Sequence, residues 1–215
     1  MLNREVELLT FDEETHSYFL GEEHLVSVTQ AIREWVEFES YGLKYMFNRF
    51  TGTVIPMKTI ELARRVGKAV HKGSKFLIEG TLEWDGLNEL VIPHLKSVEQ
   101  WAIDYRVKPE ILEVPMCSLR HRYAGTPDFV GYIKGDKYLS VIDYASGAYG
   151  MKECQTAAYE QLVREVLKYR GRIKRYCLQT GEKYRLIPFT DTGDFGEFLN
   201  HLNIYRRMKG RGIWT

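Results

Sequence analysis

Two aspartates occupy positions that a simple strand pattern would bring together. Residues 125–147 read GTPDFVGYIKGDKYLSVIDYASG, in which two runs of β-branched and aromatic residues surround Gly135-Asp136. A two-residue hairpin loop at that dipeptide would pair Asp128 with Asp143 on one face of two neighbouring strands. Directly opposed residues have Cβ atoms about 4.5–5.5 Å apart. Two ionised carboxylates held so close repel each other unless a cation or a shared proton intervenes.

A divalent cation is the simplest source of that positive charge. The neighbouring pairs on the same face, Val130 with Val141 and Tyr132 with Leu139, are apolar, so the hairpin supplies no cation of its own. Carboxylate oxygens suit Mg²⁺ or Mn²⁺, and such an ion could polarise a phosphate ester and activate water. Two alternatives stay open. One is a structural acidic pair neutralised by a distant arginine, and the other is a one-residue slip that turns the two side chains to opposite faces.

Three further residues could extend a site around the aspartate pair. Ala145 lies two positions beyond Asp143 and projects from the same strand face, and Glu113 in the preceding predicted strand could add a carboxylate. His71 lies on a predicted helix, where it is either a structural side chain or a metal ligand. As a ligand, its imidazole would favour tolerance of Mn²⁺.

Two groups of polar residues follow downstream. Gln155 and Tyr159 are four positions apart and share a helix face, so they either reach toward a substrate phosphate or base, or serve the core. A basic cluster then alternates with aromatic residues, which suits backbone attraction and base stacking on single strands. A solvated helix end explains these charges equally well. The cluster consists of Lys168, Arg170, Arg172, Lys174, Arg175 and Tyr176.

Helices and strands must position these residues, and their pattern predicts a mixed α/β fold with helices packed on a central mixed sheet. A capping-box spacing at Ser27 to Gln30 predicts a helix that runs through Trp35. Apolar periodicity predicts four further helices at 59–78, 88–105, 152–169 and 194–208. Strand-like runs lie at 6–9, 17–20, 111–117, 123–133, 138–144, 173–179 and 183–189.

Composition limits the classes of protein that remain. The chain has 215 residues and 44% hydrophobic composition, enough for one substantial core, and we expect one domain. Thirty basic and twenty-nine acidic residues give a net charge of +1, so any nucleic acid must meet a local basic patch. Three separated cysteines are too few for an iron–sulfur cluster held by four thiolates. No signal-peptide or membrane-spanning run is visible, which predicts a cytoplasmic protein without a membrane partner.

The residues above resemble the motifs of the PD-(D/E)xK nucleases, in particular the RecB-like exonuclease branch and its compact phage and mitochondrial genome-maintenance members. The likeness covers roughly residues 60–170, with the motifs in the family's order. The matching segments are Gly67-Lys-Ala-Val-His71, the strand carboxylate Glu113, Gly125-Thr-Pro-Asp128, Val141-Ile-Asp143-Tyr-Ala-Ser-Gly147, and Gln155-Thr-Ala-Ala-Tyr159.

The resemblance implies a restriction-endonuclease-like core and roles for particular residues. The core would span 57–190, with an N-terminal elaboration at 1–56 and a C-terminal helix at 191–215. One or two Mg²⁺ or Mn²⁺ ions would be held by His71, Asp128, Asp143 and the Tyr144 backbone carbonyl, with Glu113 as a possible further ligand. Gln155 and Tyr159 would join Asp128, Asp143 and Glu113 as catalytic residues.

Ala145 departs from the family, which carries a lysine at that position. A methyl group can neither position the attacking water nor balance charge on the phosphate, and such a loss commonly costs on the order of 10²–10³ in rate. The chain is therefore expected to be inactive or strongly impaired. A deliberate lysine-to-alanine change is the favoured explanation, and the alternatives are a naturally inactive relative or migration of the lysine to a position such as Lys152.

A metal-dependent DNA exonuclease is the function that these residues and the resemblance predict. Single-stranded DNA and 5′ to 3′ polarity are the expected substrate and direction. Two other classes remain: a non-catalytic DNA-binding module with a degenerate nuclease fold, and a structure-specific endonuclease.

Overall fold

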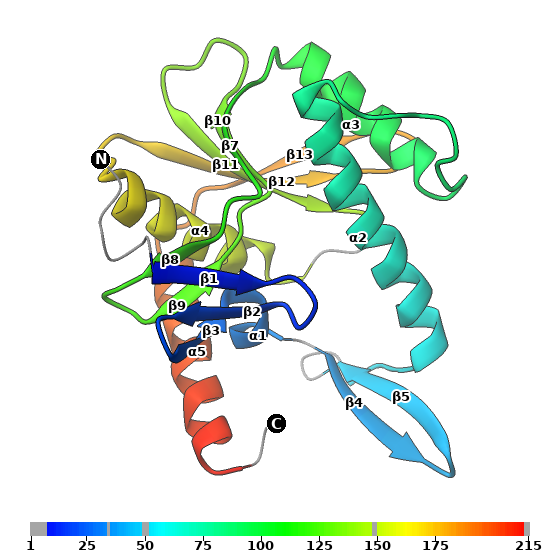
Figure 1. Ribbon diagram of the computed structural model, residues 1–215, viewed down its shortest axis with the longest axis vertical. Coiled ribbons are helices and arrows are strands. Elements are labelled where there is room, and N and C mark those ends of the chain that lie inside the picture. Colours follow the sequence, from blue (N-terminus) through cyan, green and yellow to red (C-terminus); the bar gives the residue numbers. More distant parts are fainter. Residues whose placement is uncertain (1–7, 34, 49–51, 148–149, 213–215) are drawn as a thin grey trace.

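A five-stranded mixed sheet lies at the centre of the protein (Figure 1). The computed structural model describes residues 8–33, 35–48, 52–147 and 150–212. The strand order is β13-β12-β11-β10-β7, in which β11 and β12 run parallel and the other neighbours are antiparallel. Their bounds are β7 Lys108–Leu112, β10 Phe129–Tyr132, β11 Leu139–Ala145, β12 Ile173–Gln179 and β13 Arg185–Phe189.

Helices cover both faces of this sheet (Figure 1), which confirms the predicted mixed α/β fold. Side chains alternate along β11, so Val141 packs in the cluster with α4 and α5, whereas Ile142 and Tyr144 pack with α3. None of the described helices is long and apolar enough to cross a membrane. The longer helices are α2 Met57–Glu79, α3 Ile92–Asp104, α4 Lys152–Leu167 and α5 Asp194–Gly210, each close to a helix expected from apolar periodicity.

A second sheet joins distant parts of the sequence. Its order is β1-β2-β3-β9-β8, with β3 and β9 parallel. The expected strand at 6–9 lies partly outside the described residues, and the described hairpin begins at Leu9, which pairs with Leu20. The strands are β1 Leu9–Asp12, β2 Ser17–Leu20, β3 Glu23–Ser27, β8 Met116–Ser118 and β9 Tyr123–Gly125.

The helix expected through Trp35 is wrong beyond its first turn. The capping box is present, since Gln30 N–H donates to Ser27 Oγ at 3.1 Å and Ser27 N–H donates to Gln30 Oε1 at 3.0 Å. The α1 helix nevertheless spans only Val28–Ala31, because the aromatic and β-branched residues that follow favour a strand. They begin a three-stranded sheet made of β4 Trp35–Ser40, β5 Leu43–Asn48 and β6 Val54–Pro56.

Two of the expected strands are each divided between the two larger sheets. The 111–117 run breaks at Glu113, whose φ of 48° lies in the left-handed region, and the two ends join β7 and β8. The 123–133 run breaks between β9 and β10 at Pro127, which has no N–H to donate to a sheet. This second break leaves Asp128 immediately before β10, where the two sheets meet.

The register between β10 and β11 is the predicted one, although the loop that sets it is not. Phe129 pairs with Ile142 and Val130 with Val141, as expected. The tight turn is centred on residues 134–135 rather than 135–136, with Asp136 N–H donating to Ile133 O at 2.9 Å. Lys134 and Gly135 both have positive φ, 50° and 67°, which a primed hairpin turn requires.

Candidate active site

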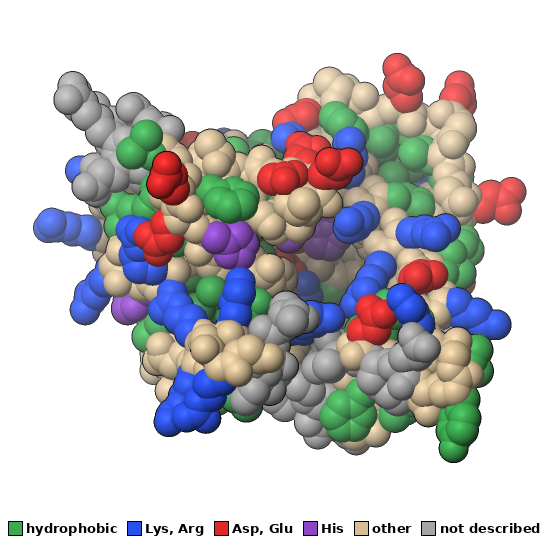
Figure 2. Space-filling model, turned by 60° about the horizontal axis from the view of Figure 1, so that its bottom comes forward, with side chains coloured by type: hydrophobic (Ala, Val, Ile, Leu, Met, Phe, Trp, Pro, Cys, Tyr) green, Lys and Arg blue, Asp and Glu red, His purple; other side chains and the backbone are tan. Residues whose placement is uncertain are grey.

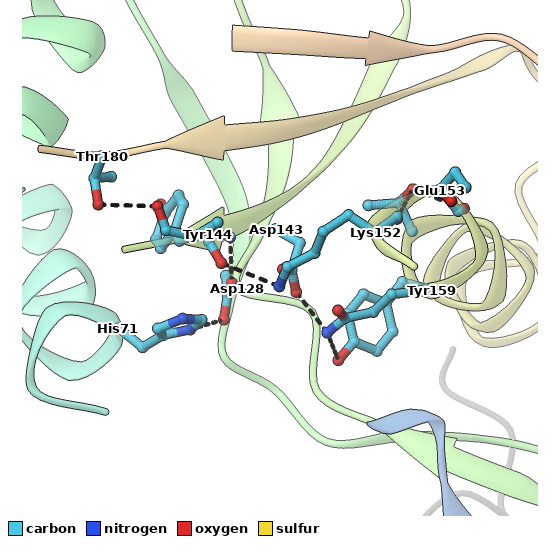
Figure 3. A network of polar contacts seen from close by, with 11 residues as sticks. His71, Asp128, Asp143, Tyr144, Lys152, Glu153, Tyr159 and Thr180 are labelled. Carbon is cyan, nitrogen blue, oxygen red and sulfur yellow. Dashed lines mark hydrogen bonds and ion pairs between the residues drawn. The ribbon is translucent and has the colours of Figure 1, made fainter. Parts of the chain in front are cut away.

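The two aspartates lie together in the protein interior (Figure 3). Asp143 is 1% exposed on the α4-facing side of β11, and Asp128 is 7% exposed just before β10. The slipped-register alternative would have turned the two side chains apart, and the observed pairing rules it out. Asp128 raises the pKa of Asp143, so each carboxylate feels the charge of the other.

Asp128 is held by one side chain and one backbone amide. His71 Nδ1, from α2, lies 2.8 Å from Asp128 Oδ1, and Tyr144 N–H donates to Oδ2 at 2.7 Å. Burial alone would raise the pKa of Asp128, but His71 and the Tyr144 amide outweigh it and hold the pKa below its usual value. The same carboxylate raises the pKa of His71 against the effect of burial, so this pair favours carboxylate and imidazolium.

Asp143 is held from the other side, by α4. Lys152 Nζ forms an ion pair with Asp143 Oδ2, and Gln155 Nε2 donates to Oδ1 at 2.9 Å. Burial raises the pKa of Asp143 to about 6 despite the neighbouring ammonium. Lys152 Nζ also donates to the Tyr144 carbonyl oxygen at 3.2 Å (Figure 3), so one ammonium contacts two of the expected metal ligands.

Lys152 therefore supplies positive charge at the aspartate pair, for which the sequence favoured a divalent cation and left a distant arginine open. It is the first residue of α4, and the preceding Met151 has a φ of 55° that turns the chain into the helix. A signal for it exists in the sequence: Lys152, Gln155 and Tyr159 have i, i+3, i+7 spacing and share one helix face. The sequence analysis named this position as one to which a lysine could have migrated, and the structure places the Lys152 ammonium against Asp143.

Gln155 and Tyr159 form the inner edge of the site. Gln155 Nε2 also donates to Tyr159 Oη at 3.0 Å, and both side chains are buried. The Tyr159 ring packs in space that only a glycine at position 125 leaves free, because a Cβ on Gly125 would lie 2.7 Å from Tyr159 Cε1. Gln155 thus contacts Asp143 directly and Tyr159 contacts Gln155, while both side chains are buried with the core; contact with a substrate phosphate or base stays a prediction.

Glu113 lies beside Asp128 but makes no contact through its carboxylate. Its backbone N–H donates to the Asp128 carbonyl at 3.3 Å. Across the described residues, the half-buried Glu113 carboxylate has no hydrogen bond or ion pair, and burial together with the charge of Asp128 raises its pKa. Among the expected metal ligands, Glu113 is the one whose carboxylate accepts no hydrogen bond from the described residues.

The donor chemistry fits a divalent metal, although the side chains as they stand do not form a finished coordination sphere. Within the described ranges, no three His, Cys, Asp or Glu side chains are grouped as closely as a metal ion requires. Protons of His71, Lys152 and Gln155 hold the aspartate oxygens instead. Three carboxylates, one imidazole and a backbone carbonyl are nevertheless ligands that Mg²⁺ or Mn²⁺ accepts, and an ammonium already lies between Asp143 and the carbonyl.

A narrow cavity of about 150 Å³ opens onto the carboxylates. Asp128, Asp143 and His71 line it together with Gln155 and Tyr159. Its outer wall comes from the second sheet and the segment after β9. That wall includes His16, Tyr18 and Thr126, and Tyr18 Oη lies 2.8 Å from Thr126 Oγ1.

Ala145 shares the strand face of Asp143, as expected, but its methyl group makes no polar contact. The Ala145 carbonyl accepts hydrogen bonds from Thr180 N–H at 2.8 Å and from Thr180 Oγ1 at 3.2 Å. Residue 145 is 6% exposed, so a lysine there would have to extend within the buried site.

The basic cluster lies at the far end of the sheet from the carboxylates. Parallel pairing sets Arg175 beside Val141 and Ile173 beside Leu139, whereas Asp143 pairs with Cys177. Four residues of strand, about 13 Å, separate Ile173 from the level of Asp143. Of the other cluster residues, Lys168, Arg170 and Arg172 are exposed, and Lys174 and Tyr176 are half-buried. No residue of the cluster lines the cavity.

Arg175 is an internal ion-pair residue rather than a surface cation. Its side chain contacts Glu160 at 3.2 Å and Asp194 at 2.8 Å, and it donates to the carbonyls of Glu153 at 3.0 Å and Asp191 at 2.6 Å. Lys174 is likewise paired with Asp136. The positive charges of Lys174 and Arg175 are therefore neutralised within the protein.

Arg175→Met should lower the free energy of unfolding by about 3–5 kcal/mol, because it leaves the buried Asp194 carboxylate without its ion-pair partner. Chemical denaturation measures this loss. Arg172→Met, at an exposed position, serves as the control and should change stability by less than about 0.5 kcal/mol. An Arg175 variant of unchanged stability that binds DNA more weakly would contradict the structural assignment.

The chain has a distant structural likeness to a protein of known structure. No family model matches the chain, and no curated protein matches it. Among solved structures, it is similar to a crystal structure of a protein from Eubacterium rectale named "Putative exonuclease", with 14% sequence identity and a TM-score of 0.42. The likeness covers 71% of this chain and 69% of that chain. Similarity at this level leaves the function to be argued from the site itself.

Proposed function

We propose that this protein is a metal-dependent DNA exonuclease that hydrolyses phosphodiester bonds. The observation that carries the proposal is that Asp128, directly before β10, and Asp143, on β11, line one cavity together with His71, Gln155 and Tyr159. These five residues come from α2, the segment directly before β10, β11 and α4. An ion pair with a purely structural role would account for only two of these five residues.

Three kinds of ligand in this chain would hold the metal: the imidazole of His71, the carboxylates of Asp128, Asp143 and Glu113, and the Tyr144 carbonyl. A bound Mg²⁺ or Mn²⁺ supplies Lewis acidity toward the phosphate and lowers the pKa of water. Tyr144 N–H fixes the orientation of the Asp128 carboxylate, and Gln155 fixes that of Asp143. Such supporting contacts commonly change metal affinity or activity by about 10–100-fold.

Lys152 takes the role that the family lysine would have at position 145. Its ammonium contacts Asp143 and the Tyr144 carbonyl, and its pKa is raised because the attraction of Asp143 outweighs burial. A permanently charged group at this place can balance negative charge on a phosphate and orient water. On this proposal the chain is active as written, in place of the impairment expected from Ala145 alone.

Cleavage of end-labelled single-stranded DNA should require Mg²⁺ or Mn²⁺ and should stop on addition of EDTA, because three carboxylates need the cation to accept a phosphate. The measurement is a time course on denaturing gels, with Asp128→Asn as the inactive control. Labels at the 5′ and 3′ ends of matched substrates report polarity, for which 5′ to 3′ degradation is expected.

Two outcomes would replace the proposal by another. Metal-dependent DNA binding without cleavage under any condition would indicate a non-catalytic module. Rapid cutting of covalently closed circular DNA would indicate an endonuclease, since an exonuclease needs an end.

A further inference from the structure

One face of α2 carries a row of cations that runs past the site. Arg64 and Lys68 precede His71 by seven and three residues and Lys75 follows it by four, so all three lie within about 60° of His71 around the helix. Gly67 and Ser74 lie on the other side of His71 and face the protein, where Ser74 is fully buried and a Cβ at Gly67 would meet Ser146. The three cations, the α2 stripe, therefore border the site on its solvent side.

None of the charges of the α2 stripe is neutralised by a neighbouring side chain in the described parts of the chain. Arg64 and Lys68 are exposed and Lys75 is half-buried, and no hydrogen bond or ion pair joins any of them to another residue. This sets them apart from Lys174 and Arg175, which are committed to carboxylates. Unpaired cations in a row have the electrostatic form of a phosphate-binding track.

None of the three cations lines the cavity itself, but two of them lie close enough to groups at the site to affect their charge. The ammonium of Lys68 lowers the pKa of His16, an effect second to the burial of that ring, and His16 lines the outer wall of the cavity. At the other end, Lys75 lowers the pKa of Glu113, opposing the larger effect of burial. From Arg64 to Lys75 the helix rises about 16 Å, which is long enough to meet several successive phosphates.

The face of the molecule drawn in Figure 2 is hollowed at its centre, with both basic and acidic side chains around the hollow. Figure 2 shows lysine and arginine side chains on either side of a central hollow, with histidine side chains close to it. The carboxylates at the bottom of the cavity are only 7% and 1% exposed, so a phosphate must enter the cavity to reach them, which favours an extended single strand over a paired duplex. A single extended strand can enter such a site.

We propose that the α2 stripe binds the sugar–phosphate backbone of single-stranded DNA and leads it to Asp128 and Asp143. This inference rests on the proposed function and names the surface that would bind the DNA strand. It also assigns strand binding to α2 rather than to the basic cluster at the start of β12.

A matched set of variants tests this assignment. The triple variant R64Q/K68Q/K75Q removes the stripe, and K58Q/R65Q/K72Q removes one arginine and two lysines from the neighbouring face of the same helix, where all three are exposed. Glutamine retains helix propensity, so both triples should fold, which circular dichroism checks. Affinity for labelled single-stranded DNA is measured by fluorescence anisotropy in EDTA, where no cleavage occurs, between about 50 and 200 mM salt.

The stripe triple should bind at least about tenfold more weakly, and its plot of log affinity against log salt should be shallower by about 2, because each phosphate contact contributes about 0.7. The control triple should change the slope by less than half as much, and R170Q/R172Q should leave it unchanged. A stripe triple with unaltered slope, or a control triple with an equal loss, would overturn the assignment. Tighter binding of a blunt duplex than of the single strand would also overturn it.

The assignment and the enzyme proposal fail separately. If no condition produces cleavage but the stripe triple still loses affinity and slope, the exonuclease proposal fails and the binding surface stands. If the wild-type protein cleaves DNA and the stripe triple binds as well as wild type, the binding surface fails and the exonuclease proposal stands.

Discussion

Replacing Lys152 by methionine should lower the rate constant for phosphodiester cleavage by about 10²–10³. The ammonium is the charged donor that contacts both Asp143 and the Tyr144 carbonyl, and methionine fills a similar volume without the charge. The measurement is single-turnover cleavage of end-labelled single-stranded DNA at saturating Mn²⁺. Under these conditions the rate constant reports the chemical step rather than affinity.

Ala145→Lys provides the comparison that identifies which position carries the lysine. If Lys152 already supplies the charge, a second ammonium beside it meets like-charge repulsion, and cleavage should stay level or fall. Lys72→Met, on the exposed face of α2, controls for loss of one positive charge and should leave the single-turnover rate unchanged. A large gain from Ala145→Lys, with little loss from Lys152→Met, would contradict the assignment and favour an inactivated lysine at 145.

The register of the site could be predicted because it depends on short-range alternation. Val130 and Val141 face one core cluster and Phe129 and Ile142 face the other, so a slip of one residue would exchange side chains between the two clusters and disrupt the packing of both. The turn could not be predicted from the dipeptide alone. Lys134 adopts a left-handed conformation, and residues 137–138 lie between the turn and β11, which restores the register.

The counter-charge was harder to predict because it comes from another element. Lys152 lies nine residues beyond Asp143, and only the path of the chain from β11 into α4 brings its ammonium back to the carboxylate. Its helical spacing with Gln155 and Tyr159 was the available signal. A motif followed residue by residue along the strand includes Ala145 but does not extend to Lys152.

The position of the basic cluster relative to the site could not be predicted, because it depends on the direction in which β12 runs. A sequence shows that residues 168–176 are basic and aromatic, but not which end of β12 lies beside the carboxylates. Parallel pairing with β11 sets the beginning of β12 beside Leu139 and its later part beside Asp143. The α2 stripe has fewer charges in sequence, yet its helical spacing with His71 directs those charges toward the site.

The ion pair between Asp143 and Lys152 also predicts a stability pattern that separates folding from chemistry. Their side chains are 2% and 15% exposed, so removing one partner leaves the other charge buried and unpaired. Asp143→Asn and Lys152→Met should each lower the free energy of unfolding in EDTA by about 3–5 kcal/mol, whereas the double variant should recover most of that loss. Urea denaturation followed by circular dichroism measures the three values.

Cleavage should not recover in the double variant, because stability depends on matching the two charges whereas catalysis depends on having both. Loss of the Asp143 carboxylate removes an expected metal ligand, which we expect to lower cleavage by about 10³ or more, equivalent to about 4 kcal/mol of transition-state stabilisation. The double variant should then be as inactive as the less active single variant while unfolding close to wild type. If its cleavage rate rose together with its stability, the ion pair would be a structural support of the site, and Asp143 and Lys152 would not take part in the reaction.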